Sequence, residues 1–218
     1  MRTLLIALLA VCLAGCGGSS ESPSNRPEIQ STGIALSLPL EPSLLWSQRC
    51  VQCHGESALH SADIPALDTL FADYISRQLR HFRDGVRTNA IMLDAVADLS
   101  DAQIAALSTW LTQQPAPSRP DAPSAPARGI GQDYYNNTCS ACHGTLAQGN
   151  EALSAPALRG LGATYLAGQY QAFLNGERGS DPRDLRGAQM QRLARALPDN
   201  LPLAEIFAYI DALPVSGP

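Results

Sequence analysis

One five-residue pattern occurs twice in this chain, 89 residues apart, and it constrains the fold more than any other feature. Residues 50–54 and 139–143 both read Cys-x-x-Cys-His. This spacing is the signature of covalent haem c attachment, in which two cysteines bond the haem vinyl groups and the histidine reaches the iron. We therefore predict two covalently bound haem c groups. The residues predicted to hold them are Cys50, Cys53, Cys139 and Cys142 as attachment points and His54 and His143 as axial iron ligands.

Cysteine usage fits this interpretation. The chain has six cysteines, and all but Cys12 and Cys16 lie in the two motifs. Disulfides within each pair are the alternative, because an exported chain meets an oxidising compartment. A histidine directly after both pairs argues against them. Zinc is a weak alternative, since its Cys2His2 sites need paired histidines further on, and the second half of the chain has only His143.

The amino terminus is predicted to be a targeting segment. Residues 4–13 are an apolar run, too short to span a bilayer. The run ends in Leu-Ala-Gly-Cys, which resembles a bacterial lipobox with Cys16 as the lipidated residue. An ordinary secretory signal is the alternative. We predict a signal peptide over 1–15, a flexible tether over 16–40, and a periplasmic protein anchored to a bacterial membrane by Cys16.

The two halves of the chain repeat each other beyond the motifs, which indicates a duplicated unit. Counted from Pro65 and Pro156, identical residues recur at the same distances: Tyr74 and Tyr165, Gln78 and Gln169, Phe82 and Phe173, Gly85 and Gly176, and Arg87 and Arg178. We predict one domain over 41–113 and a second over 129–218. Residues 114–128 contain five prolines and read as a semi-extended linker.

Apolar residues at helical spacing predict an all-α fold. No alternating strand pattern stands out. Ser100 is a plausible N-cap. The predicted helices cover residues 44–53, 71–84, 101–111, 132–142, 165–175 and 203–213.

Charge and composition exclude some functions. The formal charge is −5, which argues against nucleic-acid binding. Every basic residue is arginine, so lysine is excluded as an iron ligand. Each domain has under 100 residues and few aromatics, and a haem would supply the large apolar nucleus that such a domain lacks.

Elimination points to methionine as the second axial ligand. After His81 the only histidine is His143, which leaves Met190 as the strong candidate in the second half. In the first half Met92 competes with His60 and His81, and the similar place of the two methionines in the repeat favours Met92. His/Met ligation raises the reduction potential relative to two histidines. Because both axial positions are then filled, the pattern favours electron transfer over haem catalysis.

These residues resemble the di-haem cytochrome c4 family over residues 41–218. The resemblance includes Arg-Thr-Asn-Ala-Ile-Met at 87–92 and Gly-Ala-Gln-Met at 187–190. It implies two tandem class I cytochrome c domains that carry electrons to terminal oxidases or other reductases. It also implies that the carbonyls of Pro65 and Pro156 accept hydrogen bonds from the axial histidines.

The repeat and charge complementarity suggest that Arg87 and Arg178 contact haem propionates. Replacing either with Leu is expected to shift the potential of its own haem only.

Three functions follow, and they share most of this chemistry. The first is a membrane-tethered carrier that moves single electrons between a quinol-oxidising complex and a terminal oxidase or reductase. The second is the electron-accepting cytochrome subunit of a periplasmic dehydrogenase. The third, a haem enzyme, needs a displaced methionine or a His/Cys-ligated iron. The only cysteines outside the motifs are Cys12, in the predicted signal peptide, and Cys16, the predicted lipidated residue. The expected partners are redox proteins and a membrane, with no nucleic acid and no small-molecule substrate.

Overall fold

A computed structural model describes residues 41–55, 63–115 and 129–215. These residues belong to one compact unit, which spans 37–218. They are mostly helical and contain no strand, and their one extended contact is an isolated bridge between Asn150 and Ala155. The predictions for the signal peptide, the tether, Cys16, His60 and most of the linker lie outside the described residues.

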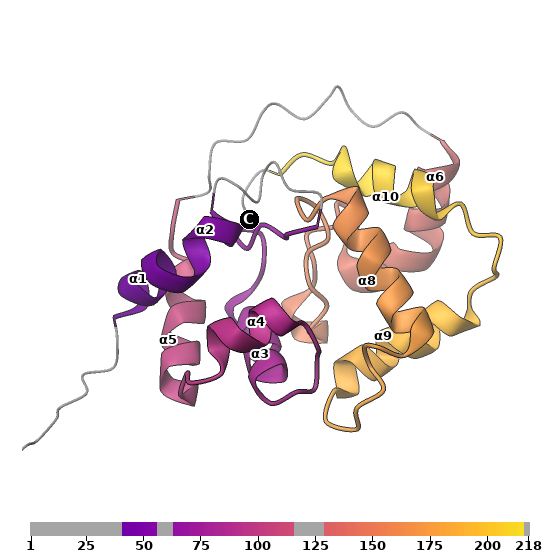
Figure 1. The fold of residues 1–218 in the computed structure, drawn as a ribbon. Helices are drawn as coiled ribbons and strands as arrows, with labels where there is room; N and C mark the ends of the chain where they lie inside the picture. Colours follow the sequence, from indigo (N-terminus) through magenta and orange to yellow (C-terminus); the bar gives the residue numbers. More distant parts are fainter. Residues whose placement is uncertain (1–40, 56–62, 116–128, 216–218) are drawn as a thin grey trace, which may run out of the picture. The chain divides into compact units, whose positions relative to one another are not determined.

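The helices of the first half appear in indigo to magenta in Figure 1. They begin with a continuous helical stretch that ends at the first motif. In order they are α1 (Pro42–Leu45), the π-helical turn η1 (Trp46–Cys50), α2 (Val51–His54), α3 (Ala72–Arg83), α4 (Ala90–Val96) and α5 (Asp101–Leu111).

The second half repeats this order, from salmon to yellow in Figure 1. It comprises α6 (Ile130–Tyr134), the π-helical turn η3 (Tyr135–Cys139), α7 (Ser140–His143), the short 3-10 helix η4 (Glu151–Leu153), α8 (Ala163–Asn175), α9 (Leu185–Ala196) and α10 (Leu203–Asp211). The all-α prediction is confirmed, and the helices at 101–111 and 203–213 match α5 and α10 to within two residues.

Helix α5 begins where the sequence predicts because its first turn is capped on both sides. The Ser100 hydroxyl accepts the backbone N–H of Gln103 at 3.2 Å, and the Gln103 side chain accepts the backbone N–H of Ser100 at 2.9 Å. This reciprocal pair satisfies two donors that an uncapped helix leaves open.

The turn after α3 and the turn after α8 have the same backbone course. Gly85 and Gly176 have φ of +70° and +82°, a conformation that disfavours side chains. Two residues later, the backbone N–H of Arg87 donates to the carbonyl of His81, and that of Arg178 donates to the carbonyl of Ala172, both at 3.0 Å. The positive φ of the glycine and the backbone hydrogen bond of the arginine therefore fix the point at which each arginine side chain leaves the helix end.

The core of each half lies between its long helices. Helix α3 packs against α5 in the first half, and α10 packs against α6 and α8 in the second. Ile104 and Ile210 are almost fully buried at 0% and 1% exposure. Among the described residues, none of the helices combines the length and apolar character needed to cross a membrane.

Candidate haem-binding site

Each Cys-x-x-Cys-His motif begins at the last residue of a π-helical turn. The turns are η1 and η3, and a short α-helix then carries the second cysteine and the histidine. None of the four cysteines in the described residues forms a disulfide. Burial raises the pKa of Cys50 and of Cys139 to about 11, so both thiols are protonated at neutral pH.

Both motif histidines are held by a backbone carbonyl from a later loop. Nδ1 of His54 donates to the carbonyl oxygen of Pro65 at 2.9 Å, and Nδ1 of His143 donates to that of Pro156 at 2.8 Å. This is the pairing that the family resemblance implies. Burial lowers the pKa of both histidines, although the carbonyl bond opposes the shift. A neutral ring whose Nδ1–H is engaged leaves Nε2 free to bind a metal.

Gly149 allows the loop of the second half to come this close. Its φ is +83°, and a Cβ there would lie 2.5 Å from the nitrogen of Ala157 and 2.8 Å from the carbonyl carbon of Pro156. Its backbone N–H donates to the carbonyl of His143 at 2.8 Å. A glycine is therefore required between the motif and the proline that orients its histidine.

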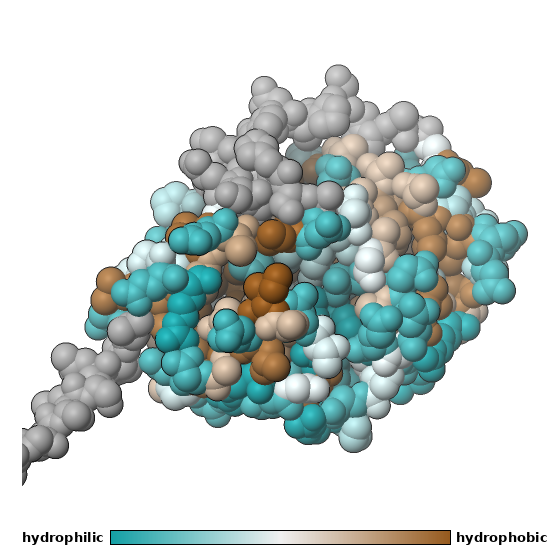
Figure 2. Space-filling view, in the orientation of Figure 1, coloured by the Kyte–Doolittle hydropathy of each residue, from teal (hydrophilic) through white to brown (hydrophobic). Residues whose placement is uncertain are grey.

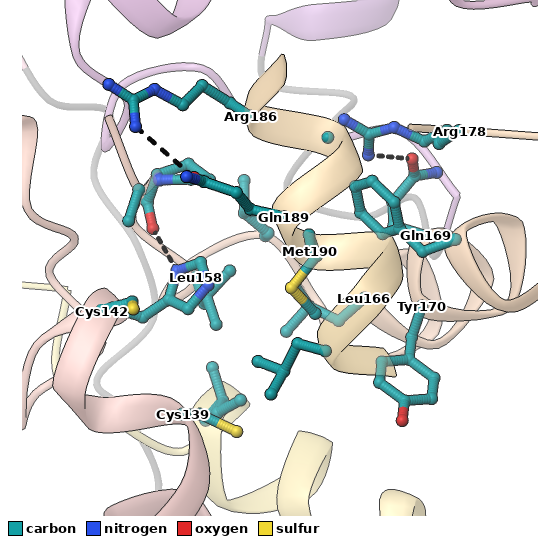
Figure 3. A pocket seen from close by; sticks show the side chains of 18 of the residues that line it. Cys139, Cys142, Leu158, Leu166, Gln169, Tyr170, Arg178, Arg186, Gln189 and Met190 are labelled. Atoms are coloured by element: carbon teal, nitrogen blue, oxygen red, sulfur yellow. Dashed lines mark hydrogen bonds between the residues drawn. The ribbon is translucent and has the colours of Figure 1, made fainter. Parts of the chain in front are cut away.

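An apolar cavity of about 490 Å³ lies against the second motif, within the range of cofactor pockets. Cys139, Cys142 and His143 stand on one wall, and Met190 on α9 stands on another. Figure 3 shows the Met190 side chain pointing from its helix into this space, toward the wall with the two cysteines. The structure thus brings together the four predicted residues of the second site.

Met92 lies on α4, the helix between α3 and α5, as Met190 lies on α9, the helix between α8 and α10. It is partly buried, packs against the core and lies on α4. The N-cap of this helix is Asn89, whose side chain accepts the backbone N–H of Met92 at 3.0 Å. His81, the competing ligand, instead lies in α3 with its Nδ1 3.9 Å from the carboxylate of Asp184 in the second half.

The two arginines of the repeat meet between the halves. The Arg87 guanidinium donates to Gln78 of its own half at 2.8 Å, and to Gln169 and the Tyr165 hydroxyl of the other half at 2.7 and 3.1 Å. Arg178 mirrors this, donating to Gln169 at 2.7 Å and to Gln78 at 3.1 Å. Each guanidinium therefore bonds a glutamine from each half.

This cluster concentrates positive charge away from water. Arg178 is buried, and among the described residues neither it nor Arg87 is paired with a carboxylate. Burial and the charge of Arg87 lower the pKa of Arg178. Burial alone would raise the pKa of Tyr74, but the charges of Arg178, Arg87 and Arg77 together lower it. Buried cations of this kind call for an anion.

A haem fits the residues that are present. The cavity of the second half supplies an apolar space, a free histidine nitrogen, a methionine sulfur and two thiols on one wall. Tyr74, Gln78 and Arg178 line the same cavity, so its polar end can receive carboxylates such as haem propionates. Among the described residues, no three His, Cys, Asp or Glu side chains gather as a metal site.

Both methionine helices carry exposed apolar side chains. Ile91 and Leu93 on α4 are 74% and 44% exposed, and Leu185 at the start of α9 is 73% exposed. In Figure 2 hydrophobic side chains interrupt the hydrophilic surface over α4. Residues of this kind are common where a protein meets a partner.

Sequence reasoning identified the residues around each motif but missed those that support them. Gly149, Asp184 and the role of the glutamine pair were not predicted. The repeat held a signal for the glutamines, since Gln78 and Gln169 occupy the same place in it. Nothing local in the sequence marks Gly149 among the 17 glycines of the chain.

Comparison with known proteins supports the haem assignment. Residues 130–213 match the family model for cytochrome c. The chain is 37% identical over 174 residues to the thiosulfate dehydrogenase electron acceptor of Stutzerimonas stutzeri, covering 74% of this chain and 78% of the relative. It is 29% identical over 171 residues to cytochrome c4 of Pseudomonas aeruginosa, covering 75% of this chain and 83% of the relative.

The fold matches solved structures as well. The crystal structure of reduced cytochrome c4 from Pseudomonas stutzeri superposes with a TM-score of 0.62 at 24% identity, covering 75% of this chain and 93% of that chain. Two covalently bound haem c groups and an electron-carrier function follow from these relationships. The chain belongs to the family of di-haem c-type cytochromes that includes cytochrome c4 and the electron acceptors of thiosulfate dehydrogenase.

Proposed function

We propose that each iron of this electron carrier is held between a motif histidine and a methionine, by His54 with Met92 and by His143 with Met190. The observation that carries the proposal is the cavity of the second half, where Met190 faces the wall formed by the second motif. The haem supplies the one-electron change between ferrous and ferric iron. The protein supplies a neutral histidine, a soft sulfur ligand and an apolar surround, which together favour a raised reduction potential.

The arginine cluster has a further role in this proposal. Arg87 and Arg178 bind the haem propionates between the halves and offset their negative charge. Their uncompensated charge and their bonds to neutral glutamines support this role. Since each arginine contacts both halves, the cluster joins the two haem surroundings into one electrostatic environment.

The electron donor is a thiosulfate-oxidising dehydrogenase, and the acceptor is a respiratory partner. The similarity to the S. stutzeri electron acceptor supports this donor, because 37% identity extends over 174 residues. The carrier is exported, tethered to a bacterial membrane through lipidated Cys16 and active in the periplasm. The apolar run that ends at Cys16 and the compartment in which c-type motifs are used support this location.

The second candidate is a permanent subunit of such a dehydrogenase. The exposed Ile91, Leu93 and Leu185 favour it, since obligate interfaces are apolar. A free carrier dissociates between turnovers, whereas a subunit co-purifies with the enzyme at low concentration. Size-exclusion chromatography of the holoprotein with the dehydrogenase of S. stutzeri separates the two candidates.

The proposed donor is tested by following haem reduction. The holoprotein, matured with two haems, is mixed with thiosulfate and catalytic S. stutzeri thiosulfate dehydrogenase, and the visible α-band is recorded. Full reduction of both haems is expected with the enzyme and none with thiosulfate alone. Haem reduction by thiosulfate without the enzyme, or no reduction with it, would contradict the proposed donor.

The ligand assignment has its own test. Ferric iron bound by methionine sulfur has a weak charge-transfer band in the red, which titrates with oxidation. Met92→His and Met190→His should each remove half of this band and lower one potential of the two. An unchanged band in either variant would show that the methionine concerned does not bind iron.

A further inference from the structure

The first half of the chain reaches the N-terminus of α9, the helix that carries Met190. Asp184 caps this helix, because its carboxylate accepts the backbone N–H of Gly187 at 2.8 Å. The residue is only 5% exposed. Nδ1 of His81, in the last turn of α3, lies 3.9 Å from the same carboxylate oxygen. A side chain of the first half thus stands against the cap of the second methionine helix.

A second contact joins the same two elements. The guanidinium of Arg183 donates to the backbone carbonyl of Asp84 at 3.3 Å, and it also pairs with Asp181 at 2.7 Å. Asp84 immediately follows α3, and Arg183 immediately precedes the cap of α9. The end of α3 therefore approaches the turn before α9 through two residues on each side.

The first half has no matching arrangement in the described residues. The N-cap of α4 is Asn89, which is exposed to solvent, whereas Asp184 is buried. The repeat position that corresponds to His81 is Ala172, whose methyl group cannot bond a cap. The two methionine helices are thus capped in the same way, but only α9 has a side chain from the other half against its cap.

His81 lacks a partner that its position demands. The residue is buried, and its Nδ1 makes no hydrogen bond to any described residue. A buried N–H without an acceptor is costly, and the Asp184 carboxylate is the acceptor within reach. The charges of Arg77, Arg87 and Arg178 also act on the ring, as do those of Asp84 and Asp181, but no hydrogen bond joins any of them to Nδ1. A closure of less than about 1 Å would let Nδ1–H donate to the carboxylate.

We propose that Asp184 is a positioning residue for Met190 and that His81 holds it in place from the first half. Methionine ligation of the second iron then depends on the contact between the halves, while ligation of the first iron depends on its own half alone. The inference rests on Met190 as the ligand of the second iron.

The test uses the full-length holoprotein and two residue-resolved readouts. The ε-methyl NMR signals of Met92 and Met190 in the reduced protein report each ligand separately. The pH at which each ferric methionine bond is lost reports how firmly it is held. The variants are His81→Ala, which copies the alanine of the repeat and so suits the helix, His81→Gln, which restores a donor, and Asp184→Ala.

His81→Ala should lower the pH of methionine loss at the second haem by roughly 0.7 unit, the effect of the one net hydrogen bond that closure of the gap to Asp184 would form. The first haem should not change, and His81→Gln should lie closer to the native protein. In the Asp184→Ala background the His81→Ala change should add nothing, as expected for two residues that act through one contact. Asn89→Ala is the mirror control and should affect the first haem only.

An unchanged second haem in His81→Ala, or equal shifts at both haems, would overturn the inference. Additive effects of the two alanine changes would do the same. If the native reduced protein lacks a shifted Met190 signal, the ligand assignment itself fails. In the other cases that signal persists, so the two failures are distinguishable.

Discussion

The N-cap of α4 offers a quantitative test of how the first methionine is held. Asn89→Ala removes the side chain that accepts the backbone N–H of Met92 at 3.0 Å. The helix has only seven residues, so its first turn is a large part of it. Loss of an Asn cap costs about 1 kcal/mol, which is roughly a fivefold change in the capped population.

This cost should appear directly in methionine ligation, because the capped N–H belongs to the ligand itself. Where loss of the ligand releases one proton, about 1 kcal/mol lowers the transition midpoint by about 0.7 pH unit. The red charge-transfer band of the ferric holoprotein, titrated toward alkaline pH, measures this midpoint. Asn89→Ser keeps a capping oxygen and should behave like the native protein.

A midpoint shift of less than about 0.2 unit in Asn89→Ala would refute a role of the cap in holding Met92. A change at the second haem instead of the first would refute it as well. Either result would mean that packing, and not the cap, holds Met92 in place.

Further predictions concern charge, pH and packing. Arg178→Leu should lower the potentials of both haems in spectroelectrochemistry, because Arg178 bonds Gln78 in the first half as well as Gln169 in the second; the shared contact replaces the expectation that only its own haem would shift. Burial lowers the pKa of His81, opposed by Asp184 and aided by the nearby arginines. Because the unfolded state has the higher pKa, it binds a proton first, and the free energy of unfolding should fall as the pH drops below about 6.5. Urea unfolding at pH 7.5 and pH 5 should show a smaller fall for His81→Ala than for the native protein. Ile104→Ala should lower the free energy of unfolding by about 3 kcal/mol in urea, since the side chain is 0% exposed.

Much of the site was predictable because its signals are local. The motifs fix the haem attachment residues by spacing alone. The capping residue Ser100 marks the start of α5, and the apolar spacing of 71–84 marks α3. The elimination of other ligands in the second half needed only a count of histidines, lysines and methionines.

The two methionine helices were not predicted, and their sequences show why. Helix α4 exposes Ile91 and Leu93, so its apolar residues do not follow one buried face. Helix α9 contains Gly187, a poor helix former, and has few apolar residues. Both helices exist because their caps and the packing around the methionines hold them, which a periodic pattern does not record.

Contacts between the halves could not be read from the chain either. The repeat pairs Gln78 with Gln169 but does not predict that each accepts a hydrogen bond from the arginine of the other half. Likewise, no sequence pattern marks His81, and its contact with Asp184 is seen only in the structure. Such contacts depend on how two similar units face each other, and that arrangement is absent from local spacing.

The π-helical turns before the motifs place a limit on grafting this haem site into a designed helical bundle. Each turn holds one more residue than an α-helical turn would, at Trp46–Cys50 and Tyr135–Cys139. Removing a residue there would rotate the following cysteines and histidine by about 100° relative to the preceding helix. A transplanted motif that begins at its first cysteine would therefore lack the turn that sets the direction of its thiols and imidazole, and the portable unit starts four residues earlier.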